Sequence, residues 1–148
     1  LDPATTLGPL VSAEQRRKVL AHVTRAAEEG ALLAQGGADS ALPAAGAFVA
    51  PTLFTGTDAS MAINREEVFG PVASVTVFDT EQEAVALAND SVYGLAAAVW
   101  TADLNKAHRM VAALEAGVVW VNCFGDGDMT LELASGEGIP LGAILSIS

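Results

Sequence analysis

The sequence has 148 residues, of which 51% are hydrophobic and 17% are charged. That length and composition predict a folded domain with a substantial core and exclude a disordered chain. Acidic residues outnumber basic ones by 18 to 7, giving a formal net charge of -11 at pH 7, so no nucleic-acid partner and no anionic membrane partner is expected.

The first half of the sequence predicts one long helix and two strands. Ser12 opens the helix with Gln15 at capping-box spacing, and Gly30 can end it in a left-handed conformation. The apolar residues of one helical face then recur at intervals of three and four. The predicted strands are Ala31–Gln35 and Phe48–Phe54, with Pro51 placing the second at an edge or bend, and Gly56–Asn64 is predicted to be a connection.

The second half predicts alternating strands and helices. They are a strand at Pro71–Phe78, a helix from Thr80 to about Ala88, a strand at Leu95–Thr101, a helix that begins at Asp103 and ends before Gly117, and a strand at Val118–Asn122. The first of these strands is apolar enough to be covered by other parts of the fold. Helical crossovers of this length predict an α/β fold with a largely parallel sheet and flanking helices. We expect Pro71–Asn122 to carry most of the core. Phe124–Ser148, rich in glycine and small apolar residues, yields no predicted element.

One stretch stands out for chemistry: Arg65–Val72, which reads R-E-E-V-F-G-P-V. A carboxylate on a turn beside an aromatic ring can hold a sugar hydroxyl. A solvated acidic turn before a strand explains the same residues, and residue chemistry alone favours that plainer interpretation.

Other residues that could carry chemistry have plainer explanations. His22 and His108 lack partners at metal-ligand spacing, so no metal site is predicted. Cys123 is the single cysteine, so no internal disulfide can form. A single cysteine fits a reducing, cytoplasmic location. Cys123 is better explained as an inert thiol than as a nucleophile. Asp126 and Asp128 lack calcium-loop spacing and are predicted to form a polar turn. No catalytic residue follows from chemistry alone.

The motifs taken in order resemble the aldehyde dehydrogenase superfamily. The matching pieces are G-P-L-V-S (Gly8–Ser12), E-E-G-A (Glu28–Ala31) with Gly36-Gly37, F-V-A-P-T-L-F (Phe48–Phe54), E-E-V-F-G-P-V (Glu66–Val72), A-N-D-S-V-Y-G-L-A-A-A-V-W-T (Ala88–Thr101) and A-G-V-V-W-V-N (Ala116–Asn122). They are collinear from Leu1 to about Thr130. Each piece is weak alone, but together they are specific, and E-E-V-F-G-P is the most specific of them.

The resemblance implies a homo-oligomeric enzyme that oxidises a small-molecule aldehyde to a carboxylic acid with NAD or NADP, through a cysteine thiohemiacetal. It implies that Glu67 holds the nicotinamide ribose hydroxyls and that Phe69 packs by the nicotinamide. It places Leu95 near the same cofactor pocket. It places Phe124 beside the aldehyde-binding tunnel.

The resemblance also shows what the sequence lacks. The family's nucleophilic cysteine, general-base glutamate and dinucleotide fold belong upstream of this segment, so Cys123 does not match the nucleophile. The sequence has no initiator Met and reads as a fragment, with no signal peptide and no membrane-spanning run. We expect residues 1–130 to be a partial catalytic domain and residues 131–148 a divergent tail.

Inactivity of this chain alone is a further expectation. Two alternatives to the enzyme remain open: a catalytically inactive remnant with the same fold, and a small nucleotide-ribose-binding module built on Glu67 and Phe69.

Overall fold

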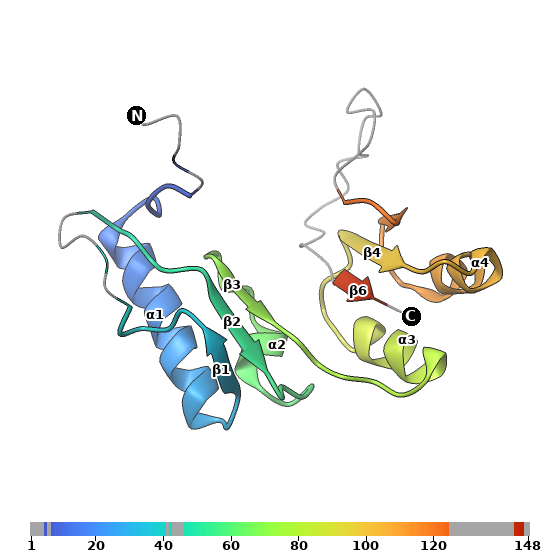
Figure 1. The fold of residues 1–148 in the computed structure, drawn as a ribbon, viewed down its shortest axis with the longest axis horizontal. Helices are drawn as coiled ribbons and strands as arrows, with labels where there is room; N and C mark the ends of the chain where they lie inside the picture. Colours follow the sequence, from blue (N-terminus) through green and yellow to red (C-terminus); the bar gives the residue numbers. More distant parts are fainter. Residues whose placement is uncertain (1–4, 6, 41, 43–45, 125–143, 147–148) are drawn as a thin grey trace. The chain divides into compact units, whose positions relative to one another are not determined.

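The computed structural model describes residue 5 and residues 7–40, 42, 46–124 and 144–146 (Figure 1). The chain divides into two compact units, Leu1–Val77 and Phe78–Ser148. Each unit has its own sheet and its own buried apolar cluster.

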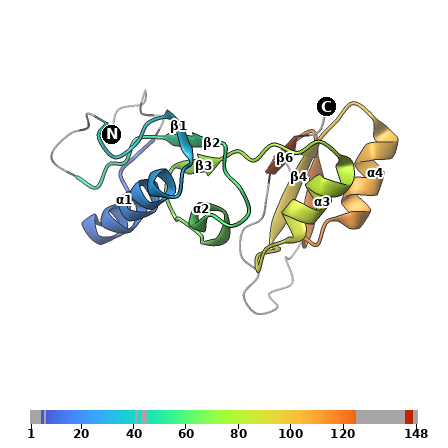
Figure 2. The ribbon, with the colours of Figure 1, turned by 90° about the horizontal axis from the view of Figure 1, so that it is seen from below.

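The first unit contains two helices and three strands among its described residues. They are α1 (Ala13–Glu28), β1 (Leu32–Gln35), β2 (Thr52–Thr55), α2 (Ala62–Arg65) and β3 (Val72–Ser74). The strand order is β1-β2-β3, with β1 antiparallel and β3 parallel to β2. Figure 2 shows α1 and α2 on one side of this sheet. The predicted helix and first strand are therefore confirmed to within a few residues.

Two strand predictions in this unit are too long. β2 begins at Thr52 and not at Phe48, because the carbonyl of Phe48 accepts a hydrogen bond from Arg16 Nε at 2.9 Å and not from a neighbouring strand. The four-residue helix α2 begins within the predicted connection, Gly56–Asn64, and extends one residue beyond it.

The strand predicted at Pro71–Phe78 is only three residues long. β3 lies at the edge of its sheet and pairs with β2 alone. The last main-chain bond along this edge runs from Val75 N to Phe54 O at 2.9 Å, where β2 itself is ending. Val75 and Val77 are 42% and 79% exposed, so the prediction of a covered strand here is wrong.

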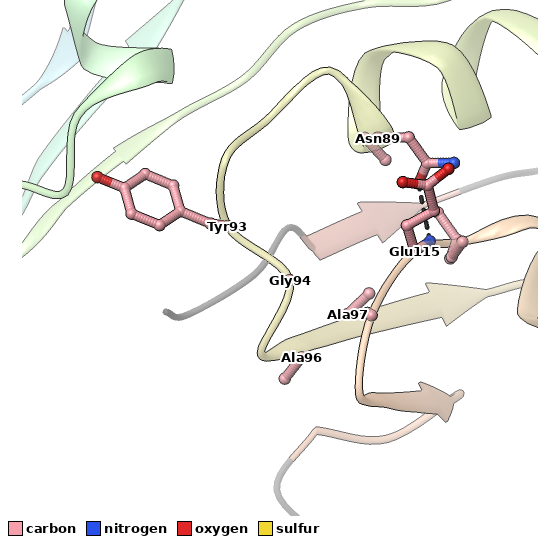
Figure 3. Close-up of a pocket in the computed structure, with 9 residues that line it drawn as sticks. Asn89, Tyr93, Gly94, Ala96, Ala97 and Glu115 are labelled. Atoms are coloured by element: carbon pink, nitrogen blue, oxygen red, sulfur yellow. Dashed lines mark hydrogen bonds between the residues drawn. The ribbon is translucent and has the colours of Figure 1, made fainter. Parts of the chain in front are cut away.

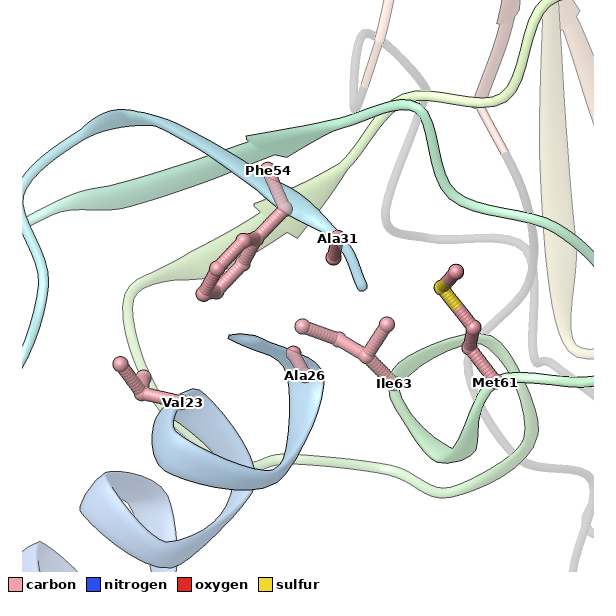
Figure 4. Packing of buried hydrophobic residues seen from close by; sticks show 6 residues of the cluster. All are labelled: Val23, Ala26, Ala31, Phe54, Met61 and Ile63. Carbon is pink, nitrogen blue, oxygen red and sulfur yellow. The ribbon is translucent and has the colours of Figure 1, made fainter. Parts of the chain in front are cut away.

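A buried apolar cluster joins the two helices of the first unit to β2 (Figure 4). Its members are Val23, Ala26, Ala31, Phe54, Met61 and Ile63. Phe54, only 1% exposed, is the largest side chain that this cluster buries completely. Nine of the 17 buried hydrophobic residues in the described part of the chain precede Pro71, so the expectation that Pro71–Asn122 carries most of the core is wrong.

The second unit contains two helices and three strands among its described residues. They are α3 (Glu81–Asn89), β4 (Ala96–Trp100), α4 (Leu104–Ala113), β5 (Val118–Val121) and β6 (Ile144–Ser146). The strand order is β5-β4-β6, and both neighbours run parallel to β4. Both helices begin at the predicted caps: Thr80 Oγ1 accepts from Glu83 N at 3.1 Å, and Asp103 Oδ1 accepts from Asn105 N at 2.8 Å.

The core of the second unit lies between its helices and β4. Ala84 of α3, Met110 of α4, Ala97 and Val99 of β4, and Leu114 form one buried cluster. Ala97 and Val99 are two residues apart on the strand and so face the same side of the sheet. Figure 2 shows α3 and α4 on the same side of this sheet.

The predicted α/β class with largely parallel pairing is confirmed. Three of the four strand pairings among the described residues are parallel, although the strands form two sheets and not one. β6 lies in the segment for which no element was predicted. A triplet of residues has too little pattern to identify a strand, and its partner β4 is distant in the sequence.

Candidate functional site

The predicted acidic turn, residues 66–70, connects α2 to β3 in the first unit. Glu66, directly after α2, is already extended, with φ -120° and ψ 140°. Phe69 has φ +50°, in the left-handed region that few aromatic residues adopt. The backbone of the turn is therefore strained at Phe69.

The turn presents its two candidate cofactor-binding side chains differently. Glu67 is half-buried, whereas Phe69 is 67% exposed. A large aromatic ring left this exposed offers an apolar face to a planar ligand. A carboxylate two residues away on the same turn adds a hydrogen-bond acceptor for hydroxyl groups.

Helix α1 holds the acidic turn through residues on successive turns. Gln15 Nε2 donates to the carbonyls of Val68, at 3.3 Å, and Phe69, at 3.1 Å. Val19 packs so closely against Gly70 that a Cβ at that glycine would lie 2.6 Å from Val19 Cγ2. The position therefore requires a residue without a side chain.

Arg25, in the last turn of α1, connects the helix to the beginning of the acidic turn. Its Nη1 donates to Glu66 Oε1 at 3.0 Å and its Nε donates to Glu29 Oε1 at 2.8 Å. The other oxygen of Glu29 accepts from Ala62 N, at the start of α2, at 2.8 Å. The hydrogen bond to Glu29, followed by the charges of Glu29 and Glu66, raises the pKa of Arg25 above its usual value. The guanidinium therefore stays charged throughout the physiological pH range.

Leu95 lies in the second unit, directly before β4. It is half-buried, and its carbonyl accepts a hydrogen bond from Val118 N at 3.2 Å. Close by, a small hollow is lined by Ala88, Asn89, Tyr93, Gly94, Ala96, Ala97, Leu114, Glu115 and Ala116 (Figure 3).

Asn89 shapes one wall of this hollow. Its Oδ1 accepts from Glu115 N at 2.9 Å, and its Nδ2 donates to Ala113 O at 2.9 Å. The cavity is about 10 Å³, close to the smallest volume that holds one water molecule. By itself it cannot hold a nicotinamide ring or an aldehyde.

Phe124 follows β5 and is 57% exposed. Its ring centroid lies 5.1 Å from that of Trp120, with an angle of 59° between the ring planes, which is a favourable aromatic contact. Asn122, between them, has φ +56°. The chain therefore turns sharply after β5 and brings Phe124 back towards Trp120.

The four predicted site residues fall in two places. Glu67 and Phe69 share the acidic turn of the first unit, and Leu95 and Phe124 belong to the second unit. Leu95 precedes β4 and Phe124 follows β5, and these strands are parallel neighbours. Leu95 and Phe124 therefore lie beyond opposite ends of this strand pair.

Sequence reasoning missed Gln15 and Arg25 as residues that hold the acidic turn. Gln15 did carry a signal, since its spacing from Ser12 predicted a capping box, and the backbone half of that motif is present as Gln15 N to Ser12 Oγ at 3.0 Å. Nothing in the sequence pairs Arg25 with Glu66.

The remaining chemical candidates are two histidines, one cysteine and two aspartates. His22 is half-buried and 3.9 Å from Glu66 Oε2, and His108 is exposed, both as predicted for surface histidines. Cys123 is half-buried and unpaired by any disulfide. Within the described ranges no three His, Cys, Asp or Glu side chains gather as a metal site would require. Asp126 and Asp128 lie outside the described residues.

The described part of the chain contains four helices, α1 to α4. None of its helices combines the length and the apolar character that crossing a bilayer requires.

Comparison with known proteins identifies the family. The sequence model of the Aldehyde dehydrogenase family matches residues 1–138, so the chain belongs to that family. A betaine aldehyde dehydrogenase of Cereibacter sphaeroides is 51% identical over 124 residues, which are 84% of this chain and 25% of that protein. A 2-hydroxymuconic semialdehyde dehydrogenase of Pseudomonas sp. strain CF600 is 47% identical, over 82% of this chain and 26% of that protein.

The fold comparison agrees with the sequence comparison. A crystal structure of indole-3-acetaldehyde dehydrogenase in complex with NAD+ has a TM-score of 0.83 and 50% identity, and the match covers 87% of this chain and 26% of that one. The family and fold expected from the sequence motifs are therefore confirmed. The chain spans about a quarter of the length of the relatives that it matches.

Proposed function

We propose that this chain supplies the nicotinamide-ribose-binding portion of an NAD(P)-dependent aldehyde dehydrogenase, which oxidises a small-molecule aldehyde to a carboxylic acid. The observation that carries the proposal is the acidic turn, where the half-buried carboxylate of Glu67 and the 67% exposed ring of Phe69 share one turn. Membership of the family and an NAD+-bound relative at 50% identity support this assignment.

The residues of the turn fit the chemistry of the cofactor. A carboxylate accepts hydrogen bonds from the two neighbouring hydroxyls of a ribose, and an exposed aromatic ring can cover one face of a nicotinamide. When bound, the nicotinamide accepts hydride from the substrate. Glu67 would hold the ribose, and Phe69 would limit where the nicotinamide can lie and exclude water from its face.

Leu95 and Phe124 complete the proposed assignment. We assign Leu95 to cofactor binding and Phe124 to binding of the aldehyde. The cysteine that forms the thiohemiacetal lies outside this chain, as do the general base and the dinucleotide fold. Residues 1–130 then form the partial catalytic domain, with residues 131–148 as its divergent tail, in a homo-oligomeric, cytoplasmic enzyme.

A titration of the isotope-labelled chain with NAD+ and NADP+, followed by NMR, tests the proposed function. We expect resonances of residues 67–70 to shift, with a dissociation constant of about 1 mM or weaker because one carboxylate and one ring make few contacts. Glu67→Gln should weaken this binding severalfold. Unshifted resonances at the acidic turn in saturating cofactor would refute the assignment of this turn.

The matched control is Glu28→Gln, which removes the same charge from an exposed position of α1 in the same unit. It should leave the dissociation constant unchanged. If Glu28→Gln and Glu67→Gln weaken binding equally, the carboxylate of Glu67 has no specific role. Cofactor binding without aldehyde oxidation by this chain is the expected result, since the proposed nucleophile lies elsewhere.

A further inference from the structure

We propose that Gln15 is a positioning residue for the acidic turn: its side-chain amide fixes the backbone at Val68 and Phe69, and thereby the direction of the Phe69 ring. This proposal rests on the proposed function for its effect on cofactor binding. The conformational effect can be measured without any ligand. Neither Gln15 nor its helix was assigned a part in the site by the sequence motifs.

The first argument is that the side chain of Gln15 bonds differently from that of Glu83, the corresponding residue of α3. At an equivalent position in α3, Glu83 N donates to the cap Thr80, and Glu83 Oε2 accepts from Asp79 N at 2.8 Å, so both bonds remain at the helix start. Gln15 N likewise donates to the cap Ser12. Its side-chain nitrogen instead reaches carbonyls 53 and 54 residues along the chain.

The second argument is the conformation at the far end of these bonds. Phe69 is left-handed, with φ +50°, a conformation that is strained for a bulky residue. Such a conformation persists only where the surroundings specify it. A single amide that donates to both the Val68 and the Phe69 carbonyl holds two successive peptide groups in one orientation.

The third argument is that two further contacts with α1 lie on either side of these peptide groups. Val19 packs against Gly70, which limits how far the turn can approach α1. Arg25 holds Glu66 at 3.0 Å, before the turn begins to reverse. The peptide groups of Val68 and Phe69 lie between these two anchors, and their carbonyls are held by Gln15.

The direct test is Gln15→Met, which keeps the length and helix propensity of the side chain but removes the donor. In the ligand-free chain, we expect the Cα and Cβ chemical shifts of Phe69 to leave left-handed values. In the NAD+ titration, we expect the dissociation constant to rise about five- to tenfold, as for the net loss of one hydrogen bond. Unchanged Phe69 shifts would overturn the proposal.

A donor-bearing variant and a control separate positioning from general destabilisation. Gln15→Lys restores a donor of similar reach and should return the Phe69 shifts towards the native values. Gln82→Met, at the exposed second residue of α3, should change neither the Phe69 shifts nor NAD+ binding. If Gln15→Lys behaves as Gln15→Met does, the amide donor is not the operative feature and the proposal fails.

The two proposals fail in distinguishable ways. If the native chain does not bind NAD+ at the turn, the proposed function falls, and the ligand-free shifts of Phe69 decide the role of Gln15 alone. If the native chain binds NAD+ and Gln15→Met binds it equally well, the proposed function stands and the positioning role is refuted.

Discussion

Asn122 and Thr101 are joined by two reciprocal hydrogen bonds at the carboxyl ends of the parallel strands β4 and β5. Thr101 N donates to Asn122 Oδ1 at 2.9 Å, and Asn122 Nδ2 donates to Thr101 O at 3.0 Å. The Asn122 backbone has φ +56°, which asparagine tolerates better than most residues. One side chain thus ends two strands together and begins the turn that leads to Phe124.

Replacing Asn122 by alanine should destabilise the second unit. Asn122→Ala removes both bonds and leaves a less tolerant residue in the left-handed region, so we expect a loss of about 2 kcal/mol in the free energy of unfolding. Urea denaturation followed by tryptophan fluorescence measures it, since Trp100 and Trp120 both lie near this junction. Asn105→Ala, at an exposed position of α4, is the control. Equal midpoints for the two variants would contradict the prediction.

Met110 is the position where truncation should cost most in the second unit. It is fully buried in the cluster of α3, α4 and β4. Met110→Ala removes most of that side chain, and we expect a loss of about 2–5 kcal/mol in unfolding free energy. Met110→Leu conserves volume and should cost less than about 1.5 kcal/mol. A near-neutral Met110→Ala would mean that the space between the helices collapses without penalty.

The ion pair between Glu81 and Arg109 should make the stability of the chain depend on pH. Arg109 Nε and Nη2 donate to the two carboxylate oxygens of Glu81, each at 2.8 Å. These hydrogen bonds lower the pKa of Glu81 below its ordinary value of 4.5. A carboxyl group whose pKa is lower in the folded state than in the unfolded state stabilises the fold. Its full contribution to the free energy of unfolding is present above the unfolded-state pKa and disappears as pH falls through the folded-state pKa.

The measurement is the urea midpoint of the native chain and of Glu81→Gln between neutral pH and pH 3. At neutral pH the native chain should have a higher urea midpoint than Glu81→Gln. This difference in midpoint should begin to shrink only below about pH 4.5 and should be mostly lost at the lowest pH. Arg109→Gln should abolish the same advantage, because the two side chains act as one pair. An advantage independent of pH would show that ionisation of Glu81 is not its source.

The cap of α3 gives a prediction that depends on one hydroxyl group. Thr80 Oγ1 accepts the hydrogen bond of Glu83 N at 3.1 Å. Thr80→Ala leaves this first-turn donor without its side-chain partner and should lower the free energy of unfolding by about 1 kcal/mol. Thr80→Ser keeps the oxygen and should be nearly neutral. The ordering of thermal midpoints, with serine above alanine, checks the prediction, and coincident midpoints would refute it.

The parts of the fold that were predictable from sequence are those that local chemistry specifies. The helices begin at Ser12, Thr80 and Asp103 because short polar side chains satisfy the first-turn N–H groups, and that requires only neighbouring residues. Strand lengths were less predictable. A strand continues only while a partner strand lies beside it, and where β2 ends, β3 ends as well.

The candidate site divides in the same way. The acidic turn was recognisable from Arg65–Val72 because its residues are consecutive. The contacts of Gln15 and Arg25 with that turn were not, because they join residues 41 to 54 positions apart. A capping pattern correctly predicted the backbone bond of Gln15 N, but it carries no information on where the side-chain amide then points.

By itself, the sequence determined the family, the alternation of helices and strands, and the identity of the residues on the acidic turn. These follow from residue order and from spacings of a few positions. Only the tertiary structure decided that the strands form two sheets, that β6 joins β4, and that α1 holds the turn carrying Glu67 and Phe69. Those outcomes depend on which distant surfaces can pack and pair together, a property of the folded chain that no short sequence window contains.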